Sequence, residues 1–223
     1  MNGTLVLMGG EEFTDGCTFD SALVEGADEV LLIPAALAYE QPRATIERAQ
    51  KWFGGMGVGV NALDVYRRAE AMDNDVAETA AAAKVVYVTS GSPMHLRSVL
   101  KDTPLLGALV EAWRNGAVVA AAGEAASVLC SNMVDSRGGA YTVGLDLLTK
   151  MTVVPRYNRW SPDKWDRTVD LAKAGLPVVG IDEATALILS PEGEWSVEGA
   201  GGVHVFVDGV RKDLSAIPTD LDR

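Results

Sequence analysis

Residues 118–130 read VVAAAGEAASVLC and contain a change from strand to helix pattern. The apolar run at the start is typical of a buried strand, and it ends at Gly123. The small residues that follow are typical of a helix packed closely on a sheet. Many α/β hydrolases hold a nucleophilic Ser or Cys on such a corner. The segment therefore predicts an α/β sheet and raises the question of whether this corner carries a nucleophile.

Strand and helix patterns alternate on both sides of this segment. Apolar runs predict strands at residues 4–8, 29–34, 58–65, 84–88 and 117–121. Helical patterns lie between them, at residues 43–53, 73–83, 95–100 and 104–114. This alternation predicts a three-layer α/β/α fold of the flavodoxin-like kind, with a mostly parallel sheet and helices on both faces.

The last third of the chain has a different pattern. Ser161 and Pro162 begin a helix that we expect to end near Gly175. Short apolar runs with Gly-containing turns lie around that helix, at residues 152–155, 177–181, 186–189, 195–197 and 203–207. They predict antiparallel or mixed strands added near the C-terminus.

Composition sets the class of protein. The chain has 223 residues, of which 48% are hydrophobic, and a formal net charge of -12. We expect one α/β domain over residues 1–213 and a weakly ordered tail over residues 214–223. The negative charge repels phosphate backbones, which argues against a nucleic-acid partner.

The sequence also lacks the patterns of membrane, signal and metal segments. No apolar run approaches the ~18–20 residues of a membrane span, and the N-terminus has no basic region of a signal peptide. We therefore expect a cytoplasmic protein with no membrane partner. The two cysteines, Cys17 and Cys130, are far apart, and no Cys/His cluster has metal-ligand spacing. This predicts no metal and no cofactor.

The corner itself lacks a reactive atom. The template Gly-x-Ser-x-Gly falls on Gly123, Glu124, Ala125, Ala126 and Ser127. This register puts Ala125 at the position of the nucleophile, and a methyl group cannot attack a carbonyl.

The order of motifs resembles peptidase family S51, which includes dipeptidase E and cyanophycinase within the class I glutamine amidotransferase-like fold. The motifs are TSGSP at 89–93 after a strand, TPL at 103–105, GAV at 116–118, AGEAASV at 122–128, GLDLL at 144–148, VPRY at 154–157 and GIDEATAL at 180–187. The resemblance covers residues 75–210, and the N-terminal MGGEE at 8–12 is consistent with it. It implies a serine-type peptidase fold with a site at the carboxyl ends of the strands.

The departures from the family pattern fall on the chemistry. The resemblance implies a Ser where Ala125 stands and a His where Arg156 stands, or Tyr157 if the alignment moves by one residue. The family's Gly-Gly-Asn-Gln loop is replaced by TSGSP, with Gly91 and Ser92 at its centre. The acidic member is retained as Glu183, with Asp182 as the alternative.

Other polar residues offer replacement chemistry. His95 follows the fourth strand on the side where α/β sheets bind ligands, and Ser127 lies one turn into the helix. A solvent-facing histidine and a packing serine are the simpler interpretations, as is an inert buried thiol for Cys130. We expect His204 to have a structural role on its strand.

Arg156 is expected to neutralise Glu124 or Glu183 through an ion pair. Such an ion pair would fill the space that the catalytic Ser, His and acid occupy in the family. We expect the pocket at this place to be formed by Gly91, Ser92, His95, Gly123, Glu124, Ala126, Ser127, Tyr157 and Asp182.

Three functions remain open from the sequence. The first is a catalytically inactive or strongly divergent S51-like protein that keeps a pocket for a small-molecule or peptide ligand. The second is an active peptide or amide hydrolase whose rearranged site uses His95, Ser92 or Ser127. The third is a purely structural subunit with no ligand. The resemblance implies a monomer or homodimer.

Overall fold

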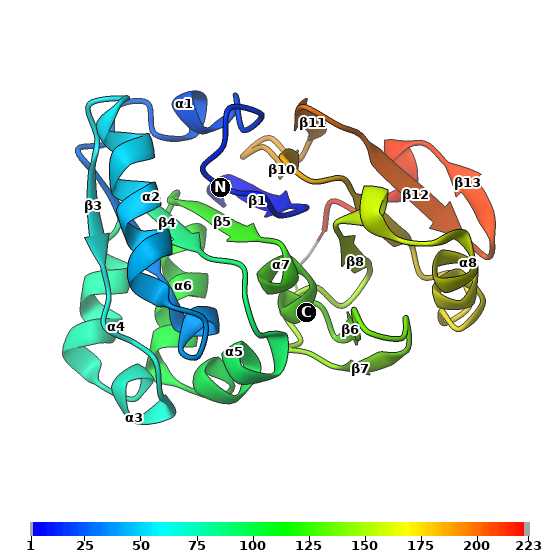
Figure 1. Cartoon of the computed structure of the whole chain (residues 1–223), viewed down its shortest axis with the longest axis horizontal. Coiled ribbons are helices and arrows are strands. Elements are labelled where there is room, and N and C mark those ends of the chain that lie inside the picture. The colour runs from blue at the N-terminus through cyan, green and yellow to red at the C-terminus, as the bar shows by residue number, and fades with distance from the viewer. Residues whose placement is uncertain (1, 221–223) are drawn as a thin grey trace.

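The computed structural model describes residues 2–220, and its centre is a seven-stranded sheet (Figure 1). In spatial order the strands are β11 (Trp195–Gly199), β10 (Thr185–Leu189), β1 (Leu5–Met8), β5 (Val118–Ala122), β4 (Val85–Val88), β2 (Glu29–Ile33) and β3 (Gly59–Ala62). The five strands from β1 to β3 are parallel, and β10 and β11 extend the sheet in antiparallel pairing. The predicted α/β/α fold with a mostly parallel sheet is confirmed.

Helices cover both faces of this sheet because side chains alternate along each strand. Val6 and Met8 point to one face, where α1 (Asp20–Leu23) and α2 (Pro42–Gly54) pack. Leu5 and Leu7 point to the other face, under α3 (Arg68–Ala71), α4 (Asn74–Ala81), α5 (Pro93–Leu100), α6 (Pro104–Arg114) and α7 (Glu124–Leu129). Two apolar cores, one on each face, make the three layers.

The helix ends follow local sequence signals. Thr103 caps α6, since its side-chain oxygen accepts a hydrogen bond from the N–H of Leu106 at 3.3 Å, and Pro104 follows at the first helical position. Asp73 caps α4 in the same way through the N–H of Asp75. The predicted boundaries of α6 agree with the structure.

A second sheet lies beside the first. It contains β13 (Val210–Lys212), β12 (Val203–Val207), β9 (Val178–Ile181) and β8 (Thr152–Pro155), in that spatial order. Strands β8 and β9 are parallel, and β12 and β13 join them in antiparallel pairing, so the strands near the C-terminus are mixed, as predicted. Helix α8 (Pro162–Asp170), the hairpin of β6 (Asn132–Val134) and β7 (Tyr141–Val143), and the 3-10 helices η1 (Ala35–Leu37), η2 (Tyr157–Arg159) and η3 (Leu214–Ala216) complete the chain. Figure 1 shows β12, β13 and α8 at the opposite end of the molecule from β3.

The chain after Asp213 was expected to be weakly ordered. Residues 214–216 form η3, and Ile217 is buried against the core. Residues 221–223 of this expected tail lie outside the described residues. Among the residues that the structure describes, no helix has the length and apolar character needed to cross a membrane.

Candidate functional site

The loops that follow β1, β4 and β5 of the large sheet and β8 and β9 of the second sheet converge at one place, at the carboxyl ends of strands, which is where open α/β sheets bind ligands. Glu11 and Glu12 follow β1, and Ser90 follows β4. Gly123 and Glu124 follow β5, Arg156 follows β8 and Glu183 follows β9. The two sheets therefore contribute to a single site.

The corner after β5 is formed by Gly123. This residue has φ 53° and ψ −125°, a conformation that is strained for any residue with a side chain. Ala125 lies two residues further on, within α7, and is fully buried. The structure thus places Gly123, and not Ala125, at the turn with the positive φ, and the assignment of Ala125 to the position of the nucleophile stays a prediction.

Ser90 fills the space beside Gly123. A Cβ on Gly123 would lie 2.4 Å from Ser90 Oγ, which is far inside van der Waals contact. Ser90 is itself buried, at 6% exposure, and its N–H donates to Glu12 Oε1 at 3.0 Å. The hydroxyl of Ser90 thus stands close to where the first side-chain atom of a nucleophile would be.

The Ser90 hydroxyl connects Glu124 to Arg156. Ser90 Oγ donates to Glu124 Oε2 at 2.7 Å and accepts from Arg156 Nη2 at 3.2 Å. Arg156 Nε also lies 3.5 Å from Glu124 Oε1. These contacts satisfy the hydroxyl and hold the guanidinium and the carboxylate on either side of it.

Arg156 forms ion pairs with three carboxylates. Its Nη1 lies 3.3 Å from Glu183 Oε1 and 3.5 Å from Glu11 Oε1, in addition to the pair with Glu124. The sequence predicted an ion pair of Arg156 with Glu124 or with Glu183, and the structure contains both. Burial lowers the pKa of Arg156, but the nearby carboxylates of Glu124, Glu12 and Glu183 raise it above its ordinary value. The guanidinium therefore stays charged and cannot accept a proton.

The backbone around Gly10 allows this arrangement. Gly10 has φ 104°, and a Cβ there would lie 3.0 Å from the Cζ of Arg156. The N–H of Arg156 donates to the carbonyl of Gly9 at 2.9 Å, and the N–H of Ala184 donates to that of Gly10 at 2.8 Å. The Gly-Gly segment after β1 therefore joins the loops of the second sheet to the first.

Glu183 is held by a cluster of donors. Arg159 Nε lies 2.6 Å from Glu183 Oε2, and Asn158 Nδ2 donates to the same oxygen at 3.3 Å. Burial acts to raise the pKa of Glu183, but the bonds from Arg159, Asn158 and Arg156 lower it below its ordinary value. Glu183 is an ionised anchor for Arg156.

Glu12 is the most deeply placed carboxylate of the site. It is 5% exposed, and burial raises its pKa, although the N–H of Ser90 and the charge of Arg156 oppose that effect. Glu12 thus accepts a backbone hydrogen bond from the Ser90 loop at the floor of the site.

A polar cavity of about 610 Å³ opens above this network. We call it the polar cavity; its lining residues are Glu11, Glu12, Thr14, Leu37, Glu40, Thr45, Arg48, Ser90, Gly91, Ser92, Pro93, Glu124, Ser136 and Arg156. Among residues 2–220, no three His, Cys, Asp or Glu side chains are grouped as metal ligands. The carboxylates of the site face Arg156 instead.

The structure separates several residues that we had placed in one pocket. Gly91, Ser92 and Glu124 line the polar cavity, whereas Ala126 and Ser127 are buried within α7. Ser127 Oγ accepts from the N–H of Val134 at 3.1 Å, which is a structural bond.

His95 and the Tyr157–Asp182 pair also lie away from the cavity lining. His95 Nε2 is 2.8 Å from the carbonyl oxygen of Tyr66. The ring of Tyr157 packs against His204 with centroids 4.3 Å apart, and Asp182 Oδ2 lies 3.4 Å from His204 Nε2. The sequence placed four further residues in this pocket, and none of them lines the polar cavity: His95, Ser127, Tyr157 and Asp182.

Sequence reasoning did not single out Ser90, Glu11, Glu12, Arg48, Asn158 or Arg159. Ser90 stood within the TSGSP loop as a departure from the family pattern, and this was the available signal for it. Glu11 and Glu12 follow Gly9-Gly10, and Arg156 and Arg159 are three residues apart. Neither spacing distinguishes a functional site from a solvated loop. Cys130 is fully buried, and burial raises its pKa to about 12, as expected for an inert thiol.

Comparison with known proteins identifies the family to which the sequence is similar. A sequence model of peptidase family S51 matches residues 5–194. Cyanophycinases of Trichormus variabilis and of Nostoc sp. are each 26% identical over 195 residues, which cover 81% of this chain and 64% of theirs. The match therefore spans less than two thirds of the length of those relatives.

Solved structures agree with this result. The crystal structure of a peptidase from an acI-B1 Actinobacterium has a TM-score of 0.83 and 26% identity, covering 95% of this chain and 93% of its own. A putative peptidase E protein from Listeria monocytogenes has a TM-score of 0.70 at 18% identity, covering 90% and 100%. The second likeness concerns the fold alone.

Proposed function

The chain belongs to peptidase family S51, and on that premise we propose that it is a non-hydrolytic member that keeps the polar cavity as a ligand-binding site. Its role is then in binding, regulation or assembly. The observation that carries the proposal is the replacement at the corner: Gly123 has no side chain, and the Ser90 hydroxyl fills the space beside it.

The absence of a base supports the same proposal. A serine hydrolase needs a group that removes the hydroxyl proton, and a guanidinium stays protonated at any physiological pH. Arg156 stands in the site where the family resemblance implies a histidine, and it is paired with Glu124 and Glu183. The site therefore has neither the nucleophile nor the base of the family's chemistry.

The lining of the polar cavity indicates the class of ligand. Glu11, Glu12, Glu40 and Glu124 outnumber the cations Arg48 and Arg156. Such a lining favours a ligand with a positively charged amino group and disfavours a free anion. We propose a small polar molecule or a peptide that presents an amino group to Glu124.

Two assays test this function. Purified protein is incubated with Asp-Xaa dipeptides and with cyanophycin, and released amines are measured; we expect no release above the level of Ser90→Ala. In parallel, the thermal unfolding midpoint is followed with the same dipeptides. We expect a rise in the midpoint that Glu124→Gln removes and that Glu111→Gln, an exposed change on α6, leaves in place.

Each of the two assays has a result that would contradict the proposed function. Turnover that depends on Ser90 would show an active hydrolase. The absence of any shift with every dipeptide would favour a purely structural subunit.

A second function is favoured by one contact. Ser90 Oγ donates to Glu124 Oε2 at 2.7 Å, which is the geometry of a hydroxyl and a carboxylate base. A hydrolase with Ser90 as nucleophile and Glu124 as base would lose its activity in both Ser90→Ala and Glu124→Gln. Arg156 Nε lies 3.5 Å from Glu124 Oε1 and therefore competes for the carboxylate that would have to accept the proton, and for this reason we place this candidate second.

A further inference from the structure

Helix α2 carries a cation that lines the polar cavity and takes no part in the network around Ser90. The guanidinium of Arg48 has no hydrogen bond or ion pair within residues 2–220. Arg156, the other cation of the lining, lies within 3.5 Å of carboxylate oxygens of three residues, Glu11, Glu124 and Glu183. The charge of Arg156 is therefore already matched, whereas that of Arg48 is available to a ligand.

A threonine one turn before Arg48 lines the same cavity. Thr45 and Arg48 are three residues apart on α2, which puts their side chains on one face of the helix. Thr45 is 8% exposed, and its hydroxyl makes no hydrogen bond within the described part of the chain, yet it is not among the side-chain oxygens that are fully enclosed. A hydroxyl and a guanidinium on one face can bind the two oxygens of one carboxylate, because both groups donate hydrogen bonds.

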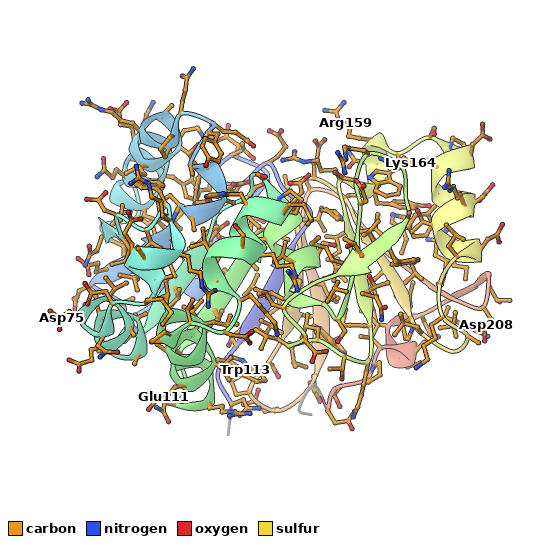
Figure 2. All side chains as sticks on the ribbon, turned by 90° about the horizontal axis from the view of Figure 1, so that it is seen from below. Asp75, Glu111, Trp113, Arg159, Lys164 and Asp208 are labelled. Carbon is orange, nitrogen blue, oxygen red and sulfur yellow. The ribbon has the colours of Figure 1, made fainter. Side chains whose placement is uncertain are left out.

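The direction of α2 places both residues at the edge of the sheet where the site lies. Strands β2 and β3 are parallel, so α2 between them runs back along the sheet, and its first turns lie at the carboxyl end of β2. Figure 2 shows the same rule at α6, where Trp113 in the last turn lies at the opposite edge of the molecule from Arg159, which binds Glu183. The first half of α2 is therefore on the side of Glu183.

The charge of Arg48 reaches the floor of the polar cavity. Burial raises the pKa of Glu12, and the positive charge of Arg48 is among the causes that oppose this rise. Such an effect needs a short distance, since salt solution screens charges that are more than about 10 Å apart. Arg48 also borders a neighbouring hollow with Lys51 and Trp52, but its action on the buried Glu12 puts its charge within reach of a ligand in the polar cavity.

We propose that Thr45 and Arg48 bind a carboxylate of the ligand, so that the polar cavity takes a zwitterion: an amino acid or short peptide whose amino and carboxyl ends are both free. Its amino group lies at Glu124 and its carboxylate at α2. This inference rests on the proposed function, which supplies the place of the amino group. The cavity, of about 610 Å³, has the size of a site for such a molecule.

Two dipeptide probes separate the two ends of the ligand. L-alanyl-L-alanine carries an amino group and a carboxylate, whereas L-alanyl-L-alaninamide carries the amino group alone. Their dissociation constants for the full-length protein are measured by isothermal titration calorimetry. We expect the free acid to bind roughly tenfold more tightly than the amide. Attraction by the excess of carboxylates in the lining, without a carboxylate site, predicts the reverse order.

Variants of α2 test which side chains make this preference. Arg48→Gln removes the cation and should reduce the preference for the free acid at least about fivefold. Thr45→Val keeps the shape of the side chain and removes the hydroxyl, so it should reduce the preference roughly threefold. The amide should bind both variants at least as tightly as it binds the natural chain, and this shows that the cavity is intact.

Lys51→Gln is the matched control. Lys51 is an exposed cation one turn after Arg48 on the same helix, and it does not line the polar cavity. Its loss changes the net charge as Arg48→Gln does, but it should leave the preference for the free acid unchanged.

The proposal stands if the natural chain prefers the free acid and if Arg48→Gln and Thr45→Val, but not Lys51→Gln, reduce that preference. It is overturned, while the proposed function stands, if the amide binds as tightly as the free acid or if either cavity variant keeps the full preference. Binding of neither probe also overturns it, and the proposed function is then decided by the Asp-Xaa dipeptides alone.

Discussion

At the scale of single residues, the site depends on the pair Ser90 and Gly123, which occupy one space between them. Placing a side chain on Gly123 requires both a strained backbone and the removal of the Ser90 hydroxyl. The two positions are therefore energetically coupled, and a double-mutant cycle measures this coupling.

Gly123→Ser alone should lower the free energy of unfolding by about 2–4 kcal/mol, because its Cβ meets Ser90 Oγ in a conformation with φ 53°. In the Ser90→Gly background the same change should cost at least about 1 kcal/mol less. Urea unfolding of all four proteins gives both values. Additive effects would show that Ser90 does not occupy the space beside residue 123.

Arg156 is the cation that faces Glu11, Glu124 and Glu183. Arg156→Met leaves these carboxylates without that partner and should lower the free energy of unfolding by about 1–3 kcal/mol, since the group is partly exposed. Arg156→Lys should lose less. The control Arg43→Met breaks an exposed pair with Glu47 and should change the value by less than about 0.5 kcal/mol. Equal effects at positions 156 and 43 would contradict a structural role for the network.

At the scale of elements, β5 and α7 show why the sequence alone did not identify Gly123 as the residue that turns the chain. Residues 120–126 are small except for Glu124, so the Gly-x-Ser-x-Gly template fits at more than one register. The register is decided by which residue takes the positive φ, and that depends on the pairing of β5 with β1 and β4. The pattern of small and apolar residues predicted that the chain turns between a strand and a helix here. Which residue makes the turn became clear only from the tertiary structure.

Helix α1 begins with a buried acid that makes stability depend on pH. Asp20 is fully buried; burial raises its pKa to about 7, opposed by the N–H of Trp52 and helped by the charge of Glu12. Because this folded-state pKa lies above the unfolded value, the stabilisation is present below about pH 4 and is lost as the pH rises through 7. The loss is on the order of 4 kcal/mol.

Asp20→Asn removes this proton, so the variant should gain stability relative to the natural chain as the pH rises from 5 to 8. Urea unfolding across this range gives the difference at each pH. Asp15→Asn, an exposed change in the same loop, is the control and should give a flat difference. A flat difference for Asp20→Asn as well would show that Asp20 is ionised throughout.

At the scale of the whole molecule, the site exists because two sheets meet. The alternating pattern predicted β1, β2, β4 and β5, since buried parallel strands are short continuous apolar runs. The sequence also predicted mixed strands near the C-terminus. It did not predict that β8, β9, β12 and β13 form a separate sheet, because apolar runs indicate strands but not their partners.

The candidate site was predictable in part for the same reason. Arg156 and Glu183 were placed from motif order, and their ion pair is present. Ser90 and Glu12 became visible only when the loops of β1, β4 and β5 were brought together. Neither residue has a sequence neighbour that marks it as part of a site.

If the polar cavity of this protein holds no reactive serine, a reagent that labels the nucleophile of serine hydrolases will leave the protein unmodified. The most direct measurement is the intact mass of the purified chain after incubation with a fluorophosphonate, beside a serine protease of known reactivity in the same reagent. We expect an unchanged mass for this protein while the protease is fully labelled. An adduct that maps to Ser90 and disappears in Ser90→Ala would contradict it.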